Sequence, residues 1–488
     1  MREHGHTAGD MLREKCGVYG IHGHPDAAKH TALGLHALQH RGQEAAGIVT
    51  HNGTQFAAHR DAGHVGDIFN NPTVMERLAG QLAVGHNRYS TTGATAMQNV
   101  QPLFAELAFG GFALSHNGNL TNAETLRREL VDNGALFQST TDTEVLIHLM
   151  AAAPAEDVVG RMTHALQRIE GAYAFVAMTS RHLIGVRDPH GVRPLVLGEV
   201  DGCYVLASES CALDIGDATF IRDIAPGEMV VIDENGLHSH KPFPTRNRQR
   251  FCIFEYIYFA RPDSVLEGRS VYQARRQIGR ELARENHAPA DVVIPVPDSG
   301  VPAAIGYADE SGVPFELGII RNHYVGRTFI EPTQSIRNLG VKLKHNANRA
   351  FIEGKRVVLV DDSIVRGTTS AKIVKMVREA GAREVHMRIA APPTRHPCFY
   401  GIDTPNESEL LASHHDVAGM AERIGCDTLA FISFDGMYRA AGMPGRDAVQ
   451  PQFCDACFTG DYPIPLTDRE AGGEAASKDL FGLLHAGG

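Results

Sequence analysis

The sequence predicts a two-domain chain in which an α+β domain, built from antiparallel sheets with packed helices, precedes an α/β domain with a parallel sheet. Its 488 residues are enough for two or three domains. From Cys16 to about Val230, short apolar stretches alternate with glycine, asparagine and aspartate turns, a pattern typical of many short strands. Beyond about residue 250, near-continuous apolar strands alternate with helical periodicity, as a parallel sheet buried on both faces requires.

The first half carries the antiparallel pattern. A strand is expected at Val18–Ile21, directly after Cys16, and helices are expected at His30–His40 and Ala123–Asn133. Further strands are expected within residues 82–90, 112–120, 171–178, 182–188 and 203–210. Helices packed against such strands place this half in the α+β class.

The second half begins after a change in composition. Residues 238–250 are polar and basic with two prolines, which indicates a linker. Apolar strands are expected within DVVIPVPDSG (291–300) and RVVLVDDS (356–363), and helices within 270–286 and 368–381. From about Leu466 the chain is rich in alanine, glycine and charge, which predicts a loosely held tail.

The composition excludes several classes of protein. The formal net charge of -11 disfavours general binding to nucleic acid. The chain contains no apolar run long enough to span a bilayer, and Met1–Lys15 has no apolar centre of the kind found in a secretory signal. Eight cysteines in such a chain favour a metal-binding or catalytic role over disulfides. We therefore expect a cytoplasmic enzyme that does not bind a membrane.

The stretch VVLVDDSIVRGTTS, residues 357–370, is the most informative in the chain. Apolar residues lead into Asp361 and Asp362, whose oxygens suit ribose hydroxyls or Mg²⁺. Glycine allows close backbone approach, and hydroxyl groups with N–H groups at a helix start form an anion cradle. The residues expected to hold a phosphate are Arg366, Gly367, Thr368, Thr369 and Ser370. The alternative is an ordinary strand–turn–helix whose acids cap the helix, but the complete stretch favours phosphate binding.

This stretch resembles the phosphoribosylpyrophosphate (PRPP) motif of type I phosphoribosyltransferases, and VIPVPDSG, 293–300, resembles their pyrophosphate loop. The resemblance implies that Ser299 joins Asp361 and Asp362 in a magnesium site. Residues 323–346 are interpreted as a lid whose cations, among them Lys342 and Lys344, cover pyrophosphate and exclude water. The alternative for this segment is a solvated surface hairpin.

Cys16 opens the motif CGVYGI, and two interpretations compete for it. One is a small buried residue, since free cysteine is among the most buried residue types. The other is that Met1–Lys15 is a propeptide whose removal makes Cys16 the first residue. A free α-amino group, with a pKa of about 7.7–8.0, can take the thiol proton and return it to departing ammonia. An amide nitrogen cannot, so cleavage after Lys15 is predicted to switch on glutamine hydrolysis.

Three further stretches offer the remaining parts of a glutaminase: GHNRYST with Arg88, SHNGNL with Asn117 and Gly118, and STTDTE with Asp142. Each is weak alone, because Asn-Gly is usually a turn and a lone charge is usually on the surface. Together with CGVYGI and QHRGQEAAG they resemble the N-terminal-nucleophile (Ntn) glutamine amidotransferases. The resemblance implies that Arg88 and Asp142 bind glutamine and that Asn117 and Gly118 form the oxyanion hole.

A glutaminase half followed by a PRPP site resembles the amidophosphoribosyltransferase family. The resemblance implies a propeptide at 1–15, an Ntn αββα domain at 16–245, a type I phosphoribosyltransferase domain at 246–465 and a flexible tail at 466–488. It also implies formation of 5-phosphoribosylamine, the first committed step of purine biosynthesis, inhibition by purine nucleotides, and a homotetramer. The segments 188–195 and 208–214 match the family too, and we interpret them as substrate-loop or domain-contact segments.

Four cysteines form a candidate metal centre: Cys252, Cys398, Cys454 and Cys457. A C-x-x-C pair with two distant cysteines suits zinc or an iron–sulfur cluster, and spacing alone does not choose between them. The four positions resemble those of the cluster-bearing branch of the family, which implies one [4Fe-4S] cluster and one Mg²⁺ per subunit. Two other functions stay open: another N-terminal-cysteine amidotransferase, such as a glucosamine-phosphate or asparagine synthase, and a non-catalytic nucleotide-sensing relative.

Overall fold

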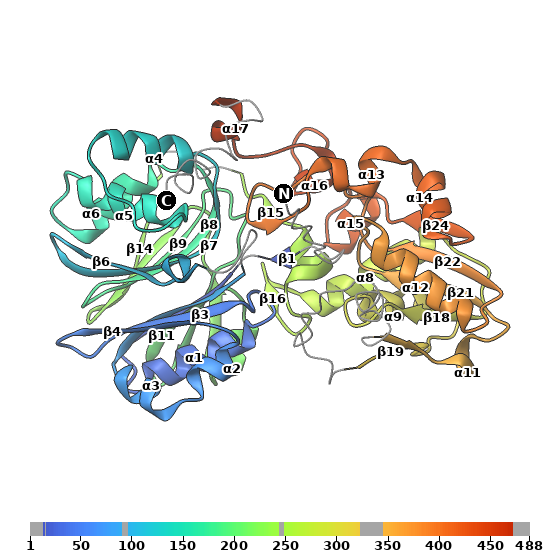
Figure 1. The fold of residues 1–488 in the computed structure, drawn as a ribbon, viewed down its shortest axis with the longest axis horizontal. Helices are drawn as coiled ribbons and strands as arrows, with labels where there is room; N and C mark the ends of the chain where they lie inside the picture. The colour runs from blue at the N-terminus through green and yellow to red at the C-terminus, as the bar shows by residue number, and fades with distance from the viewer. Residues whose placement is uncertain (1–12, 15, 90–95, 244–247, 323–344, 472–488) are drawn as a thin grey trace, which may run out of the picture.

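The computed structural model describes residues 13–14, 16–89, 96–243, 248–322 and 345–471. Two lobes lie side by side (Figure 1). The lobe coloured blue to green holds the first half of the chain, and the lobe coloured yellow to orange holds the second half. The two-domain organisation expected from the sequence is therefore present.

Two antiparallel sheets stack face to face in the first domain. The seven-stranded sheet has the order β12 (Thr219–Asp223), β10 (Val196–Val200), β11 (Cys203–Ala207), β2 (Gly17–His22), β5 (Leu82–Arg88), β3 (Ala45–His51), β4 (Phe56–Ala62). The six-stranded sheet has the order β14 (Gly236–His240), β13 (Met229–Asp233), β9 (Leu183–Arg187), β8 (Gly171–Met178), β7 (Gly110–Leu120), β6 (Leu103–Leu107). Val18 and Val84 of one sheet meet Val176 and Leu183 of the other in a fully buried core.

Helices cover the outer faces of both sheets. The seven-stranded sheet is covered by α1 (Ala27–Ala37), α2 (Val65–Phe69) and α3 (Pro72–Arg77), and the six-stranded sheet by α4 (Ala123–Asp132), α5 (Thr143–Ala152) and α6 (Val158–Leu166). Strand β2 shows why its sequence is apolar throughout: Val18 faces the other sheet, whereas Tyr19 and Ile21 face the helices. The predicted αββα class is confirmed.

The second domain is built on a parallel sheet with the order β18 (Val292–Pro295), β21 (Arg356–Asp361), β22 (Glu384–Ile389), β24 (Thr428–Phe431). Its longer helices are α8 (Val271–Glu285), α9 (Val301–Ser311), α12 (Thr368–Glu379), α14 (Val417–Ile424) and α15 (Phe434–Ala440). Ser270 caps α8 by accepting a hydrogen bond from the Gln273 N–H. The predicted α/β class is confirmed, with the helices at 270–286 and 368–381 close to their expected bounds.

The remaining helices and strands are short and lie outside the main sheets and the helices named above. They are β1 (Arg13–Glu14), η1 (Met97–Asn99), α7 (Cys211–Asp214), β15 (Phe251–Cys252), η2 (Glu255–Phe259, a π-helix), β16 (Val265–Leu266), β17 (Arg269–Ser270), β19 (Ile319–Arg321), β20 (His345–Ala347), α11 (Arg349–Ile352), β23 (Ile402–Asp403), η3 (Glu407–Glu409), α13 (Leu411–His414), β25 (Phe453–Cys454), α16 (Ala456–Thr459) and α17 (Thr467–Ala471). Among these short strands, two pairs join segments that are far apart in the sequence: β1 pairs with β23, and β15 pairs with β25.

Two sequence expectations are corrected at their edges. The predicted linker 238–250 starts too early, because residues 236–240 form β14, an edge strand whose polar side chains face solvent. The tail predicted from Leu466 is held at its start, because α17 follows and Asp468 binds the first turn of α4. The expected lid lysines, Lys342 and Lys344, lie outside the described residues.

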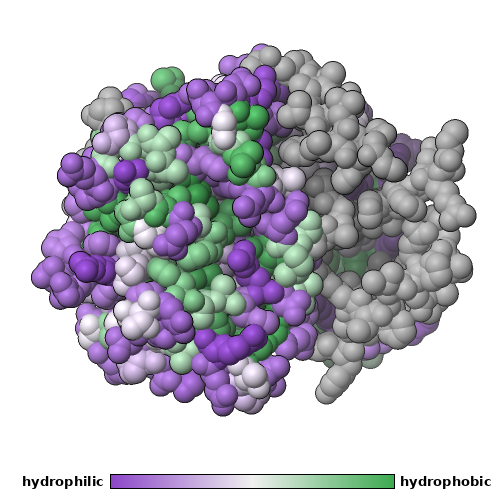
Figure 2. Space-filling view, turned by 60° about the vertical axis from the view of Figure 1, so that its left-hand side comes forward, coloured by the Kyte–Doolittle hydropathy of each residue, from purple (hydrophilic) through white to green (hydrophobic). Residues whose placement is uncertain are grey.

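The surface of the first domain carries both hydrophilic and apolar side chains. On the visible face of the first domain, hydrophilic side chains surround a band of apolar ones (Figure 2). Within the described ranges, no helix is both long enough and apolar enough to cross a bilayer.

Candidate active sites

The predicted nucleophile lies at the edge of the seven-stranded sheet. Cys16 immediately precedes β2, its side chain is buried, and its φ of 69° is left-handed, a conformation that non-glycine residues rarely adopt. Gly17 pairs with Asn87 of β5, so Cys16 and Arg88 stand at the same end of adjacent strands. The fold thus brings together two residues that are 72 positions apart in the sequence.

Arg88 is positioned with part of its guanidinium unused. Its Nη1 donates to the Asn99 carbonyl oxygen over 2.5 Å, while its buried Nε has no hydrogen-bond partner among the described residues. The Asn99 side chain also exchanges two hydrogen bonds with Thr140, of 2.8 and 3.0 Å. Asn99, which sequence motifs did not single out, therefore links Arg88 to the loop before Asp142. A carboxylate is the natural acceptor for the remaining guanidinium N–H.

Asn117 and Gly118 lie near the end of β7. The Asn117 side chain is fully buried, and neither its Oδ1 nor its Nδ2 has a partner within the described part of the chain. Since buried polar atoms are nearly always hydrogen-bonded, this amide is suited to a ligand. Gly118 has a φ of 140°, and a Cβ there would lie 2.0 Å from the Ala172 carbonyl oxygen, so the position requires glycine.

Asp142 is tied to the same strand. Its Oδ2 accepts a 2.9 Å hydrogen bond from the Leu120 N–H, and its Oδ1 lies 3.7 Å from His116 Nδ1. His116 also contacts Thr143 Oγ1 over 3.0 Å. Three of the five predicted glutaminase residues thus lie on or against one strand, because Asp142 is anchored to β7, which carries Asn117 and Gly118. The sequence motifs did not single out His116 and Thr143, because their positions beside Asp142 depend on the fold.

The acid pair of the second domain lies at the carboxyl end of β21. Asp362 accepts hydrogen bonds from Ser299 Oγ and from Ser363 Oγ, and its own N–H donates to Asp361 Oδ1 over 2.9 Å. Burial raises the pKa of Asp362 above its ordinary value, an effect opposed by the hydroxyl groups and the Arg275 guanidinium. The predicted trio of Ser299, Asp361 and Asp362 is therefore brought together.

The expected phosphate cradle begins at Gly367. This glycine has a φ of 77° and stands at the N-cap of α12, and no side chain caps this end of the helix. Thr368 is exposed and Thr369 half-buried, whereas Ser370 is buried. Arg366 Nε donates to Glu409 Oε2 over 2.9 Å, so this guanidinium already has a carboxylate partner. The uncapped N-terminus of α12 is suited to bind an anion. The Arg366 side chain is held by its hydrogen bond to Glu409 of η3.

The four predicted cluster cysteines converge from distant segments. Cys252 lies opposite Cys454 in the β15–β25 pair. The negative charges of Cys252 and Cys398 contribute to raising the pKa of both Cys454 and Cys457, after burial as the main cause. None of the four forms a disulfide. Four neighbouring thiols without disulfides, three of them buried and Cys398 half-buried, fit a shared metal centre.

No group of three or more His, Cys, Asp or Glu in the described ranges is arranged to hold a single metal ion. For Ser299, Asp361 and Asp362, all ligand atoms are oxygens, which fits Mg²⁺. Lys342 and Lys344 lie outside the described residues, so the structure does not place them.

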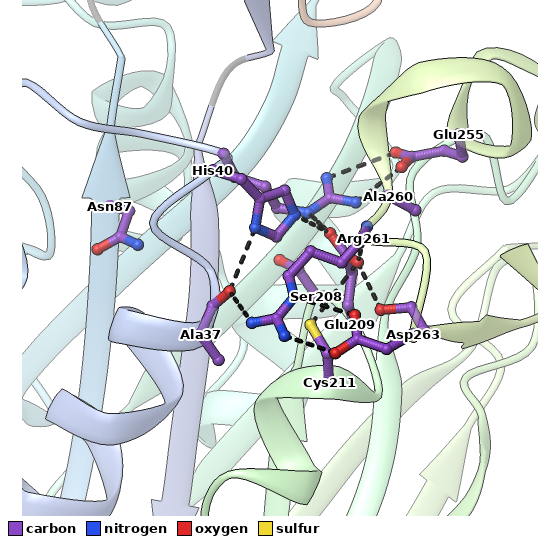
Figure 3. A network of polar contacts seen from close by, with 12 residues as sticks. Ala37, His40, Asn87, Ser208, Glu209, Cys211, Glu255, Ala260, Arg261 and Asp263 are labelled. Carbon is purple, nitrogen blue, oxygen red and sulfur yellow. Dashed lines mark hydrogen bonds and ion pairs between the residues drawn. The ribbon is translucent and has the colours of Figure 1, made fainter. Parts of the chain in front are cut away.

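A buried ionic network joins the two domains (Figure 3). Glu255 of η2 binds Arg41 Nη2 over 2.7 Å and Arg193 Nη2 over 2.8 Å, and all three side chains are fully buried. Glu209 binds Arg41 and His40 and accepts a 2.8 Å hydrogen bond from the Arg261 N–H. Burial alone would raise the pKa of Glu209, but Arg41 and His40 lower it below its ordinary value. The segments 188–195 and 208–214 thus contribute to the domain contact.

Comparison with known proteins supports both halves. A model of the glutamine amidotransferase domain matches residues 86–214, and a model of the phosphoribosyl transferase domain matches residues 263–396. The chain is 58% identical to amidophosphoribosyltransferase of Rhizobium etli over 485 residues, 98% of this chain and 97% of that one. It is 49% identical to the Bacillus subtilis amidophosphoribosyltransferase over 456 residues, 93% of this chain and 95% of that one.

Solved structures agree. The fold matches glutamine PRPP amidotransferase from Bacillus subtilis complexed with ADP and GMP, with a TM-score of 0.88 and 48% identity over 92% of this chain and 98% of that chain. A second structure, described as the allosteric regulatory enzyme of purine biosynthesis, matches with the same TM-score of 0.88 and 48% identity over 92% of this chain and 97% of that chain.

Proposed function

Because the chain belongs to the amidophosphoribosyltransferase family, we propose that it converts PRPP, glutamine and water into 5-phosphoribosylamine, glutamate and pyrophosphate. This is the glutamine-dependent first step of purine biosynthesis. A different N-terminal-cysteine amidotransferase is disfavoured for two reasons. The second half of the chain matches the phosphoribosyl transferase domain, and the similarity to amidophosphoribosyltransferase extends over nearly the whole chain. A non-catalytic relative is disfavoured by the built glutaminase site.

The observation that carries the proposal is the buried Asn117 amide, whose two polar atoms lack partners among the described residues. The Cys16 thiolate attacks the glutamine carboxamide carbon, and the oxyanion that forms accepts hydrogen bonds from Asn117 Nδ2 and the Gly118 N–H. Arg88 binds the glutamine carboxylate and Asp142 its ammonium group. Ammonia leaves with the returned proton, and water then cleaves the thioester to give glutamate.

The base in this step is the α-amino group that removal of residues 1–15 creates. The backbone at Cys16 supports cleavage there, since its left-handed φ of 69° stores strain beside the Lys15–Cys16 bond. The freed amine can take the thiol proton directly, and no other base is required.

In the second domain, ammonia attacks C1 of PRPP and pyrophosphate departs with inversion at C1. The first-turn N–H groups of α12 and the hydroxyls of Thr368 and Thr369 bind the 5-phosphate. Ser299, Asp361 and Asp362 would hold the ribose hydroxyls and magnesium, which supplies positive charge to the leaving pyrophosphate. Neutral ammonia is already nucleophilic, so this half needs positioning more than a base.

Cys252, Cys398, Cys454 and Cys457 would hold a [4Fe-4S] cluster, one per subunit. The burial of Cys252, Cys454 and Cys457, with Cys398 half-buried beside them, and the absence of disulfides among the four support this assignment. The cluster would connect Cys454 and Cys457, near the end of the second domain, to Cys252 near its start, which would be a structural rather than a redox role.

Regulation and assembly follow the relatives. The solved Bacillus subtilis relative is complexed with ADP and GMP, which supports inhibition of this chain by purine nucleotides. We also propose a homotetramer in the cytoplasm.

The deciding experiment uses protein expressed from the complete sequence and purified without air, with removal of residues 1–15 verified by mass spectrometry. Pyrophosphate and glutamate are measured with PRPP and glutamine, then with ammonia replacing glutamine. With glutamine, equal amounts of pyrophosphate and glutamate support the proposal, and with ammonia, pyrophosphate alone is expected. Glutamate without pyrophosphate would point to another amidotransferase, and neither product to a non-catalytic relative. Iron and sulfide analysis of the same sample tests the cluster, and a colourless zinc-loaded protein would contradict it.

A further inference from the structure

A segment of the second domain lies directly against the proposed oxyanion strand. Residues 399–403 follow Cys398 and end in β23. The Phe399 carbonyl oxygen accepts a 3.0 Å hydrogen bond from Asn119 Nδ2. Asn119 is two residues beyond Asn117 on β7, so the contact reaches the part of the strand that carries the oxyanion donors.

The closest approach is between two glycines. Gly401 has a φ of 108°, and a Cβ built there would lie 2.8 Å from Gly118 Cα and 3.0 Å from Gly118 C. Both distances are shorter than ordinary van der Waals contact. The backbone of residue 401 therefore packs on the backbone of residue 118 with no space between them.

The same segment contacts the chain that leads into the nucleophile. β23 pairs in antiparallel fashion with β1, with Glu14 opposite Ile402. Because β1 lies within residues 1–15, whose removal we propose, this pairing belongs to the unprocessed chain, and the contact of residues 399–403 with the strand of Asn117 and Gly118 is the one that remains in the processed enzyme.

Further hydrogen bonds hold residues 399–403 and the helix α4, which follows β7 in the chain. Tyr400 Oη donates to the Ile464 carbonyl oxygen over 2.7 Å. Beyond it, the Asp468 carboxylate accepts hydrogen bonds of 2.8 and 2.9 Å from the Glu124 and Thr125 N–H groups, in the first turn of α4. The strand end is therefore contacted by the second domain, and the helix that follows it is capped by Asp468, from the segment that follows that domain.

We infer that residues 399–401 position the oxyanion hole, so that glutamine cleavage requires this contact from the phosphoribosyltransferase domain. The inference rests on the proposed role of Asn117 and Gly118. Oxyanion donors act only within about 2.7–3.1 Å of the developing charge. A displacement of about 1 Å costs about 100-fold in rate. Strand β8 holds Gly118 through the Gly118–Tyr173 pairing, and Gly401 packs against the Gly118 backbone as well.

The test is Gly401→Ala in the full chain. The added methyl group must displace Gly118, so kcat for glutamine hydrolysis falls about 10- to 100-fold. The KM for glutamine stays within about twofold, because Arg88 and Asp142 are not touched. Ammonia-dependent synthesis and the rate of Cys16 alkylation by iodoacetamide stay at wild-type values, since neither uses the oxyanion hole.

Gly425→Ala is the matched control. Gly425 also has a positive φ, 84°, but no atom lies within 4 Å of a Cβ built there. It carries the same kind of backbone strain without the contact, and it should keep full glutamine-dependent activity.

Asn119→Ala provides a second variant in case Gly401→Ala does not fold. It removes the hydrogen bond to Phe399, together with a 3.2 Å hydrogen bond from Asn119 Nδ2 to the Leu120 carbonyl oxygen, and lowers kcat in the same direction by a smaller factor. Wild-type kcat in either folded variant, or an equal loss of ammonia-dependent synthesis, would overturn the inference. Asn117→Ala separates it from the proposed function: if that variant keeps its glutaminase rate, the oxyanion assignment itself is wrong.

Discussion

The two proposed sites are assembled in different ways. The glutaminase site collects Cys16, Arg88, Asn117 and Asp142 from four segments, and residues 399–401 of the other domain lie against it. Among the described residues, the PRPP site is nearly continuous in sequence, with residues 357–370 supplying every proposed site residue except Ser299. A site at the end of one parallel strand can be built by one loop, whereas a site between antiparallel strands depends on many distant contacts.

The sites also differ in what their polar groups do without substrate. Asn117 is fully buried with unused hydrogen-bonding capacity among the described residues. Asp362 accepts hydrogen bonds from two serines, and Arg366 is paired with Glu409. The first site is therefore organised to bind a ligand without rearrangement, and the second must exchange existing contacts for new ones.

The largest effect that separates the sites is expected for Cys16→Ala. Removing the nucleophile should lower glutamine-dependent synthesis by at least about 1,000-fold, because no other group forms the thioester. Ammonia-dependent synthesis should be retained, and both rates are measured as pyrophosphate release. Loss of both activities would mean that Cys16 is mainly structural.

The reciprocal change is Asp361→Asn with Asp362→Asn. Synthesis from PRPP should fall at least about 100-fold with either nitrogen source, because the charges that hold magnesium and ribose are gone. Basal glutamine hydrolysis, measured as glutamate without PRPP, should be retained. Unchanged formation of phosphoribosylamine would remove the PRPP assignment.

This difference explains what the sequence could predict. The continuous stretch 357–370 and both fold classes follow from local periodicity and spacing. Asn99 and His116 were not foreseen, because their roles depend on strand register and on contacts with distant residues. Gly401 was not foreseen either, since a glycine in a loop gives no sign of a backbone contact with residue 118 in another domain.

A smaller effect is expected where the two regions meet. Glu255→Gln leaves the buried guanidinium groups of Arg41 and Arg193 without their shared carboxylate. Breaking a buried ion pair from one side costs about 3–5 kcal/mol of stability, so the Tm should fall clearly in thermal unfolding. Asp26→Asn is the control, because its ion pair with Lys29 is solvent-exposed, and its Tm should equal that of the wild type. Equal Tm values for the two variants would show that the network does not support the domain contact.

The smallest effect is expected for Glu144→Gln, beside the glutamine clamp. Burial alone would raise the pKa of Glu144, but hydrogen bonds from His148, Ser139 and Gln138 lower it from 4.5 to about 2. The folded-state pKa is depressed, so this carboxylate stabilises the fold above about pH 4.5 and loses that effect as the pH falls toward 2. The variant should lose about 1 kcal/mol of unfolding free energy at neutral pH, and this difference should shrink in acid.

The same substitution distinguishes the two sites kinetically. Glu144 accepts hydrogen bonds of 2.8 and 2.7 Å from the Gln138 and Ser139 N–H groups, which hold the loop leading to Asp142. Loosening this loop should raise the KM for glutamine about two- to fivefold and leave the KM for PRPP unchanged. Glu129→Gln, in an exposed pair with Arg168, is the control and should change neither constant. Parallel pH–stability curves for Glu144→Gln and the wild type would show that the carboxylate does not stabilise the loop.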